Sequence, residues 1–216
     1  MFNFIAQNNG RVLSESVFYA SNPTPLTGIA SDTVAQAYSD TEALMTIYNS
    51  ALKDLDKDQN QVIVPVFLKL TATAINTGAT NFHIVGELSS SNRYTSGGTT
   101  LTSNSTSLDG QPGYTSRTAK SVVNFGDIVT TADLTQQRAF STHISENRLA
   151  VDETIEIWFG EAPNMSSLNN VRVVPPVWIG RESSLVIHGF GASQTVSPDF
   201  MVEFCFLETG HKRFSL

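Results

Sequence analysis

The chain has 216 residues and a net charge of −7, with 40% hydrophobic and only 15% charged residues, so it is long enough for one sizeable core or at most two small ones. The acidic balance argues against nucleic acid as the main partner, because phosphate binding requires clustered Lys and Arg. No apolar run approaches the roughly 18–20 residues that a membrane helix needs, and the single cysteine, Cys205, excludes an internal disulfide.

Residues 1–40 are predicted to form an N-terminal arm. The opening stretch, MFNFIAQNNGR, has no basic region and too short an apolar patch for a signal peptide. The two prolines of SNPTPLTG disfavour a continuous helix or a central strand. We therefore expect Phe2, Phe4, Ile5 and Arg11 to contact another protein or a neighbouring subunit, for example by strand addition. An ordinary first strand of the domain is the alternative.

Most of the remaining chain shows the period-two alternation of β-strands. A strand is expected at 43–51, although 31–55 also has some helical periodicity, and both interpretations stay open. The other predicted strands, in chain order, are 11–20, 61–74, 82–88, 122–130, 139–145, 153–160, 171–179, 183–189 and 200–208.

Two of these strands have well-defined apolar faces. The strand at 61–74 contains Pro65, which predicts an edge strand or a strand start, and its predicted apolar face consists of Val62, Val64, Val66, Leu68 and Leu70. The last strand is the clearest, with one face made of Phe200, Val202, Phe204 and Phe206.

A long polar connection at 89–121 is predicted to be a surface loop, with a flexible turn at 95–100 and a short strand near Thr100–Thr102. About eight short strands with turn signals between them predict an all-β sandwich or barrel. Long connections without tight Asn-Gly hairpins favour Greek-key crossings, so a jelly-roll domain over 41–216 is the leading candidate.

The residues give no active site and no cofactor or metal site. None of the four histidines pairs with another at metal-ligand spacing, and His188 is expected to be a solvent-facing or interface residue. Glu153 and Glu156 would lie on opposite faces of a strand, so they would not act as paired carboxylates. Trp158 and Trp178 are interpreted as core or interface anchors rather than a sugar-stacking platform.

The acidic stretch at 54–65 fits the EF-hand pattern only in part. Asp54, Asp56 and Asp58 occupy its first, third and fifth positions. Gln59 stands where the calcium loop requires glycine, and Pro65 where it requires a bidentate glutamate. A solvated turn is therefore predicted.

Five segments follow one another along the chain: EALMTIYNS, VIVPVFLKLTATA, NRYTSGG, VPPVWIGRESSLVIH and FMVEFCFLE. In their order and spacing, these segments resemble small structural proteins of tailed-phage virions. The resemblance implies a decoration or cement protein with a jelly-roll fold, bound as a homotrimer between major capsid proteins on the outer capsid surface. It also implies a structural or interface role for His188. Arg181 and Glu182 replace the family's Pro-Gly-like turn, which leaves the geometry of that turn open.

Two other functions remain as alternatives. A receptor- or glycan-binding head of a phage spike or tail would use the loop at 89–121, with Arg93, Tyr94 and Tyr114 as contacts, although the chain lacks a repetitive shaft. A β-sandwich enzyme, such as a cupin or a glycosidase, is disfavoured by the missing histidine pair and carboxylate pair.

Overall fold

The computed structural model describes residues 17–31, 37–51, 61–74, 81–105, 119–133, 135, 137–144, 150–160, 170–192 and 198–210. Every regular element within these ranges is a β-strand, which confirms the all-β prediction. There are thirteen strands rather than about eight: β1 (Val17–Ser21), β2 (Ile29–Ala30), β3 (Glu42–Asn49), β4 (Gln61–Ala74), β5 (Asn81–Ser89), β6 (Tyr94–Thr100), β7 (Thr102–Ser105), β8 (Ser121–Thr130), β9 (Gln137–Ile144), β10 (Thr154–Phe159), β11 (Val171–Val174), β12 (Ser184–Ala192) and β13 (Asp199–Gly210). In the described residues, no helix is long and apolar enough to span a membrane.

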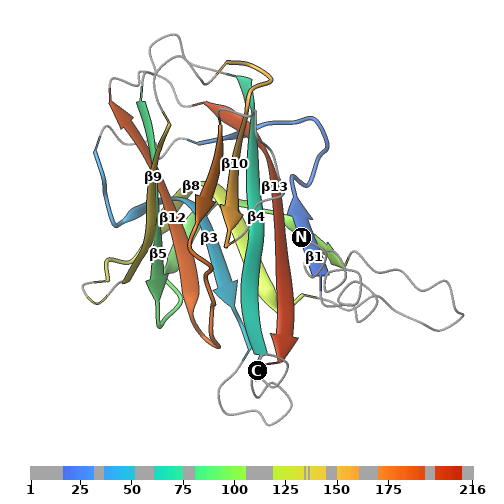
Figure 1. Ribbon diagram of the computed structural model, residues 1–216, viewed down its shortest axis with the longest axis vertical. Coiled ribbons are helices and arrows are strands. Elements are labelled where there is room, and N and C mark those ends of the chain that lie inside the picture. Colours follow the sequence, from blue (N-terminus) through green and yellow to red (C-terminus); the bar gives the residue numbers. More distant parts are fainter. Residues whose placement is uncertain are drawn as a thin grey trace, which may run out of the picture.

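The strands form two sheets that lie against each other as in a β-sandwich (Figure 1). One sheet has seven strands, in the order β11-β10-β4-β13-β1-β7, with β2 pairing β13 off this path. The other has six strands, in the order β6-β8-β3-β12-β5-β9. Among the described strands, only β10 and β11 are both consecutive in the chain and paired in a sheet, and they are parallel. The described strands are therefore joined by crossing connections rather than as an up-and-down meander.

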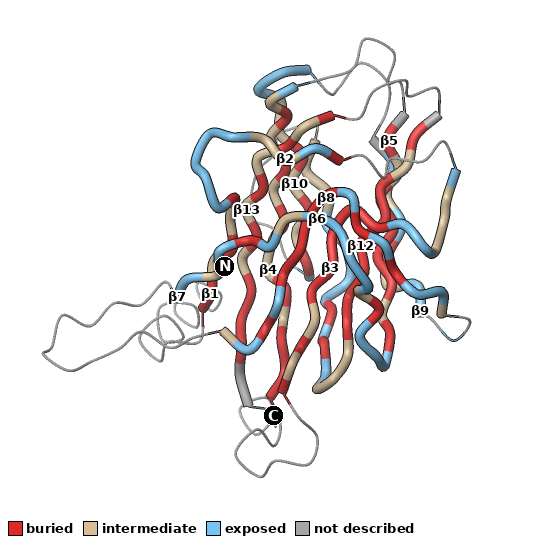
Figure 2. Tube along the Cα trace, turned by 180° about the vertical axis from the view of Figure 1, so that it is seen from behind, coloured by how far each residue is buried: buried red, intermediate tan, exposed pale blue. Residues whose placement is uncertain are grey.

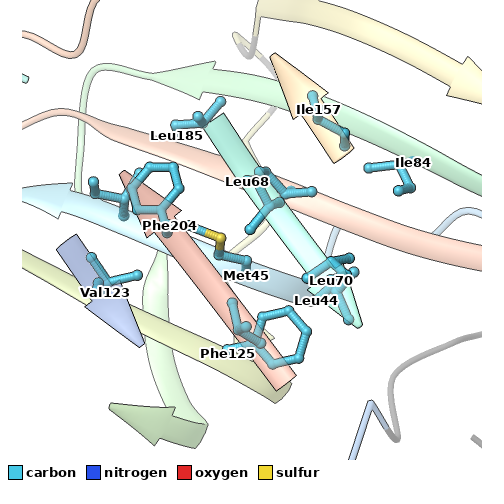
Figure 3. Close-up of a cluster of buried hydrophobic side chains, with 14 of the residues drawn as sticks. Leu44, Met45, Leu68, Leu70, Ile84, Val123, Phe125, Ile157, Leu185 and Phe204 are labelled. Atoms are coloured by element: carbon cyan, nitrogen blue, oxygen red, sulfur yellow. The ribbon is translucent and has the colours of Figure 1, made fainter. Parts of the chain in front are cut away.

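The hydrophobic core lies between the two sheets (Figure 3). The seven-stranded sheet contributes Leu68 and Leu70 from β4 and the buried face of β13, which consists of Phe200, Val202, Phe204 and Phe206 as predicted. The six-stranded sheet contributes large side chains that include Leu44, Met45, Ile84, Phe125 and Leu185. Each fully buried side chain of this size stabilises the fold by about 1.5–3 kcal/mol, which makes this layer the main source of stability.

The predicted face of β4 is only partly correct, because the strand contains a bulge. The register between β4 and β13 shifts between Cys205 and Phe206, so that Val66 has no partner in β13. Such an extra residue exchanges the two faces of a strand. As a result, Ile63 and Pro65 are buried, whereas Val64 and Val66 are only half-buried.

The prediction that Pro65 marks an edge strand or a strand start is wrong. β4 lies inside the seven-stranded sheet, between β10 and β13. Pro65 is nevertheless tolerated, because β10 pairs with β4 only over Phe67–Thr71 and the bulge lies next to the proline. No ladder hydrogen bond is therefore required from the proline nitrogen on the β10 side.

The described part of the connection at 89–121 is more regular than predicted. Residues 94–100 form β6, which pairs with β8 instead of forming a flexible turn. Gly97 and Gly98 have φ values of 82° and 69°, and a Cβ on Gly97 would lie 2.1 Å from the carbonyl oxygen of Asp127. This close approach of two backbones explains the paired glycines.

The structure also bears on the N-terminal third of the chain. Within 1–40, residues 17–21 form β1, which pairs with β13 and β7, so they are part of the folded sheet. The described part of the ambiguous segment 31–55 contains strand β3. Phe2, Phe4, Ile5 and Arg11 lie outside the described residues, and their predicted contacts stay predictions.

Candidate functional site

Within the described ranges, no three or more His, Cys, Asp and Glu side chains are grouped to hold a metal ion. Glu153 accepts a hydrogen bond from the backbone nitrogen of Ala150 at 3.2 Å, and Glu156 accepts one from the indole nitrogen of Trp158 at 3.0 Å. The two carboxylates therefore have separate partners. The acidic stretch Asp54–Asp58 lies outside the described residues.

The outer face of the six-stranded sheet holds a buried charged cluster, made of Glu87, Arg93, His188 and Tyr38. The Arg93 and Glu87 side chains are 0% exposed and form an ion pair, with Nη1 and Oε2 3.1 Å apart. Arg93 also donates hydrogen bonds to the backbone oxygens of Thr131 and Asp40. The Tyr38 hydroxyl donates to Glu87 Oε1 at 2.5 Å. Residues 38–40 and the end of β8 thus close over this part of the sheet.

His188 is the fourth member of this charged cluster, and its side chain is buried. Its Nδ1 lies 2.6 Å from the carbonyl oxygen of Glu42, so Nδ1 is the donor in that hydrogen bond. Its Nε2 lies 3.2 Å from Glu87 Oε2, without the alignment of a full hydrogen bond. Of the positions expected for His188, the solvent-facing one is wrong, because the chain itself covers β12 at this point. The interface role stays a prediction.

These contacts also change the acidity of Glu87. Burial alone raises the pKa of a carboxyl group, but the contacts with His188, Tyr38 and Arg93 outweigh burial and lower the pKa of Glu87 to about 2. Glu87 is therefore a carboxylate at neutral pH, and its charge is compensated inside the protein.

Of the three predicted loop contacts, Arg93 is not at the surface. The chain turns back after β5 and places Arg93 over Glu87, where its guanidinium is fully buried. Tyr94 is half-buried against Ala43, Ile128 and Val186, and its hydroxyl donates to the Gly97 carbonyl at 2.9 Å. Tyr114 lies outside the described residues.

Farther along the same outer face, two histidines meet across strands β5 and β9. His83 and His143 are directly opposite in the register, and their ring centroids are 4.5 Å apart. The ring of Phe190 stacks on His83 at 5.2 Å. Burial, followed by the nearby His143, lowers the pKa of His83, so its imidazole is neutral at pH 7. The sequence did not predict this pair, because the two histidines are far apart in the chain and meet only through the pairing of β5 and β9.

The outer face of the seven-stranded sheet carries a continuous line of apolar side chains. The register places Tyr19 opposite Cys205, Cys205 opposite Phe67, Phe67 opposite Trp158, and Trp158 opposite Val173. We call these five residues the outer row. It crosses β1, β13, β4, β10 and β11, a span of about 19 Å at the usual strand spacing.

The side chains of the outer row remain partly accessible. Tyr19, Cys205, Phe67 and Trp158 are half-buried, and Val173 is 57% exposed. The rings of Phe67 and Trp158 pack together with centroids 5.1 Å apart. Figure 2 shows the wider pattern, with buried stretches along the central strands and exposed stretches along β6 and the connections. No described segment buries the outer row as residues 38–40 and 93 bury the charged cluster.

Polar side chains lie beside the outer row in the next row of the sheet. Lys69 and Glu203 form an ion pair at 2.7 Å, and each side chain is 35% exposed. The Tyr19 hydroxyl donates to Glu203. Burial raises the pKa of the Cys205 thiol to about 11, so the thiol is protonated at neutral pH and is a poor nucleophile. The row thus offers contact area rather than a reactive group.

Trp178 occupies a separate surface position. Its side chain is 48% exposed at a hollow of about 340 Å³, which is also lined by Leu88, Ser89, Gln137 and Ser183 among others. Trp178 is therefore accessible, whereas Trp158 packs into the outer row.

Comparison with known proteins adds no relative: no protein-family model, curated protein or solved structure matches the chain.

Proposed function

We propose that the protein is a structural protein of a tailed-phage virion, which decorates and stabilises the outer surface of the capsid by binding between major capsid proteins. In this proposal it is a homotrimer with a jelly-roll fold, and the outer row lies in the contact between its subunits. Phe2, Phe4, Ile5 and Arg11 make the contact with the capsid. The function is mechanical and needs no cofactor.

The observation that carries the proposal is the outer row. A strip of half-exposed apolar side chains across five strands is unfavourable in water, because burying apolar surface gains about 25 cal/mol per Å². Contiguous patches of this kind mark protein–protein contacts, and symmetric association is the usual way to cover them.

A turn supports the resemblance to virion proteins. Glu182 stands where that family has a glycine, and its φ of 53° lies in the left-handed region that glycine adopts freely. The turn into β12 therefore has the backbone conformation that a Pro-Gly-like turn would favour, despite the different side chains. The crossing connections between the two sheets likewise support a jelly-roll relationship.

Light scattering tests the subunit contact. The unmodified protein is expected to be a trimer at micromolar concentration, and Val173→Asp should convert it to a folded monomer, because the carboxylate would be buried in the contact. Val129→Asp is the matched control: Val129 is 46% exposed on β8, outside the outer row, so this variant should remain a trimer. A monomeric unmodified protein, or equal behaviour of the two variants, would rule out the proposed contact.

Capsid binding is tested separately by deleting residues 1–10. The truncated protein lacks Phe2, Phe4 and Ile5 but retains the outer row, so it should form trimers that no longer co-sediment with capsids built from the major capsid protein. Normal decoration by the truncated protein would contradict the assignment of these residues. Failure of the full chain to bind capsids would contradict the virion function itself.

The Trp178 hollow favours a second candidate function, the glycan-binding head. Sugars bind through an aromatic face together with hydroxyl and amide partners, and Trp178, Ser89, Ser183 and Gln137 supply these groups. A glycan array should then give hits that Trp178→Ala removes and Trp158→Ala retains. An array without hits would exclude this candidate.

A further inference from the structure

We propose that His83 and His143 form a surface site for one divalent transition-metal ion, of the class Cu²⁺, Ni²⁺ or Zn²⁺. The site lies on the outer face of the six-stranded sheet, where β9 is the edge strand beside β5. It is independent of the outer row and of the proposed virion function. The two imidazoles supply two nitrogen ligands, and water supplies the others.

The register of the two strands gives the required geometry. Directly opposite residues in an antiparallel pair have Cβ atoms about 4.5–5.5 Å apart, so their side chains extend in parallel. The two ring centroids are 4.5 Å apart, with 42° between the ring planes. Since imidazole nitrogens bind such ions at about 2.0–2.1 Å, one ion reaches both rings only when the rings nearly touch, as these do.

The position of His83 is fixed before any ion binds. Phe190 stacks on its ring with only 11° between the planes, and Tyr38 meets Phe190 edge-on at 6.0 Å. Tyr38 is in turn held by its hydrogen bond to Glu87. A ligand that is already oriented loses little conformational freedom on binding, which favours affinity.

The surroundings select the class of ion. His143 is exposed and His83 is half-buried, so water and metal ions reach the pair. Arg172 donates a hydrogen bond to the backbone oxygen of His143 at 3.4 Å, so this oxygen is already engaged and the imidazoles are the remaining ligands. Imidazole prefers the later first-row metals, whereas Mg²⁺ and Ca²⁺ prefer oxygen ligands. Mg²⁺ and Ca²⁺ are therefore not expected to bind here.

A bound ion would fasten the edge strand β9 to β5. Because the ion binds the folded chain through two strands that separate on unfolding, it stabilises the fold by mass action. This gives a readout that does not depend on any biological activity of the protein.

The test uses the full chain without a polyhistidine tag, with NiCl₂, ZnCl₂ or MgCl₂ as the probe. We expect a Kd for Ni²⁺ below about 1 mM by calorimetry, and a rise in Tm of about 3 °C or more at saturation, with no effect of Mg²⁺. His143→Ala, a substitution at an exposed position, should weaken Ni²⁺ binding by at least about tenfold. His83→Ala should weaken it to a similar extent.

Ser141→Ala is the matched control, since Ser141 is exposed on β9 two residues from His143 and opposite Val85 rather than His83. It should bind Ni²⁺ as the unmodified chain does. The proposal is overturned if the unmodified chain does not bind Ni²⁺ up to about 1 mM, or if His143→Ala binds it equally well.

Discussion

The outer faces of the two sheets differ in how far the described chain covers them. On the six-stranded sheet, the chain folds back over its own strands and encloses the Arg93–Glu87 ion pair, whose side chains are 0% exposed. On the seven-stranded sheet, the side chains of the Lys69–Glu203 ion pair are each 35% exposed, next to the half-exposed outer row. A face that its own chain has closed needs no partner, so the open face is the better candidate for assembly. The comparison also predicts very different energies for two chemically similar ion pairs.

The largest expected effect comes from removing the charge of Glu87. Glu87→Gln should lower the free energy of unfolding by about 3–5 kcal/mol, because it leaves the Arg93 guanidinium buried without its counter-charge. Urea denaturation measures this loss.

A double substitution sharpens this prediction. Glu87→Leu combined with Arg93→Met removes both charges and keeps the volume, so it should be less destabilising than Glu87→Gln alone. If the single variant loses less than about 1 kcal/mol, the pair is not the closed cluster described above.

The second-largest effect is expected from acid, which should remove the stability that the Glu87 carboxylate contributes. The pKa of Glu87 is about 2 in the folded chain, against an ordinary value of 4.5. A carboxyl group with a lowered pKa stabilises the fold fully above its unfolded value, and this contribution disappears as the pH falls from about 4.5 to about 2. The stability lost over this window is up to about 3 kcal/mol. Thermal unfolding between about pH 5 and pH 2 should therefore show a smaller pH dependence for Glu87→Gln than for the unmodified chain.

A smaller change is expected from Tyr38→Phe, which removes one hydrogen bond to Glu87 but leaves both charges in place. A hydrogen bond to a charged group contributes about 1.5–3 kcal/mol when buried, and Tyr38 is half-buried, so a loss of about 1–2 kcal/mol is expected. Chemical denaturation gives the value, and Tyr94→Phe is the control, because its hydroxyl bonds only a surface turn. Equal losses in the two variants would argue against a special role of Tyr38.

Local alternation was enough to predict much of the fold. The expected strands at 82–88, 122–130, 153–160 and 200–208 coincide closely with β5, β8, β10 and β13. In β10 and most of β13, a single buried face imposes the period of two. The error in β4 has a physical cause: a bulge exchanges the faces of a strand without leaving a mark in the hydrophobic pattern.

The sites were harder to predict, since they depend on pairing between distant strands. Arg93 stands in a polar, Ser-rich stretch, and nothing near it in the sequence indicates that Glu87 and Tyr38 enclose it. The outer row takes one residue from each of five strands, so no local motif contains it. The charged cluster and the outer row can be identified only from the pairing of the strands.

The smallest effect is expected on the open face. Glu203→Gln breaks the ion pair with Lys69, but both side chains are 35% exposed, and water screens most of their attraction. The amide oxygen introduced by this substitution could still accept the hydrogen bond from Tyr19, and Lys69 would remain solvated. In the monomeric Val173→Asp background, where no second subunit covers this face, the free energy of unfolding should therefore fall by less than about 1 kcal/mol, several times less than for Glu87→Gln. Denaturation of both variants in about 0.1 M and about 1 M NaCl makes the contrast sharper, because salt should remove what remains of the Glu203 effect and leave most of the Glu87 effect. A loss at Glu203 as large as that at Glu87 in the Val173→Asp monomer would mean that this face is closed within one chain. A large loss confined to the unmodified chain, with a trimeric mass by light scattering, would show instead that the proposed second subunit covers it.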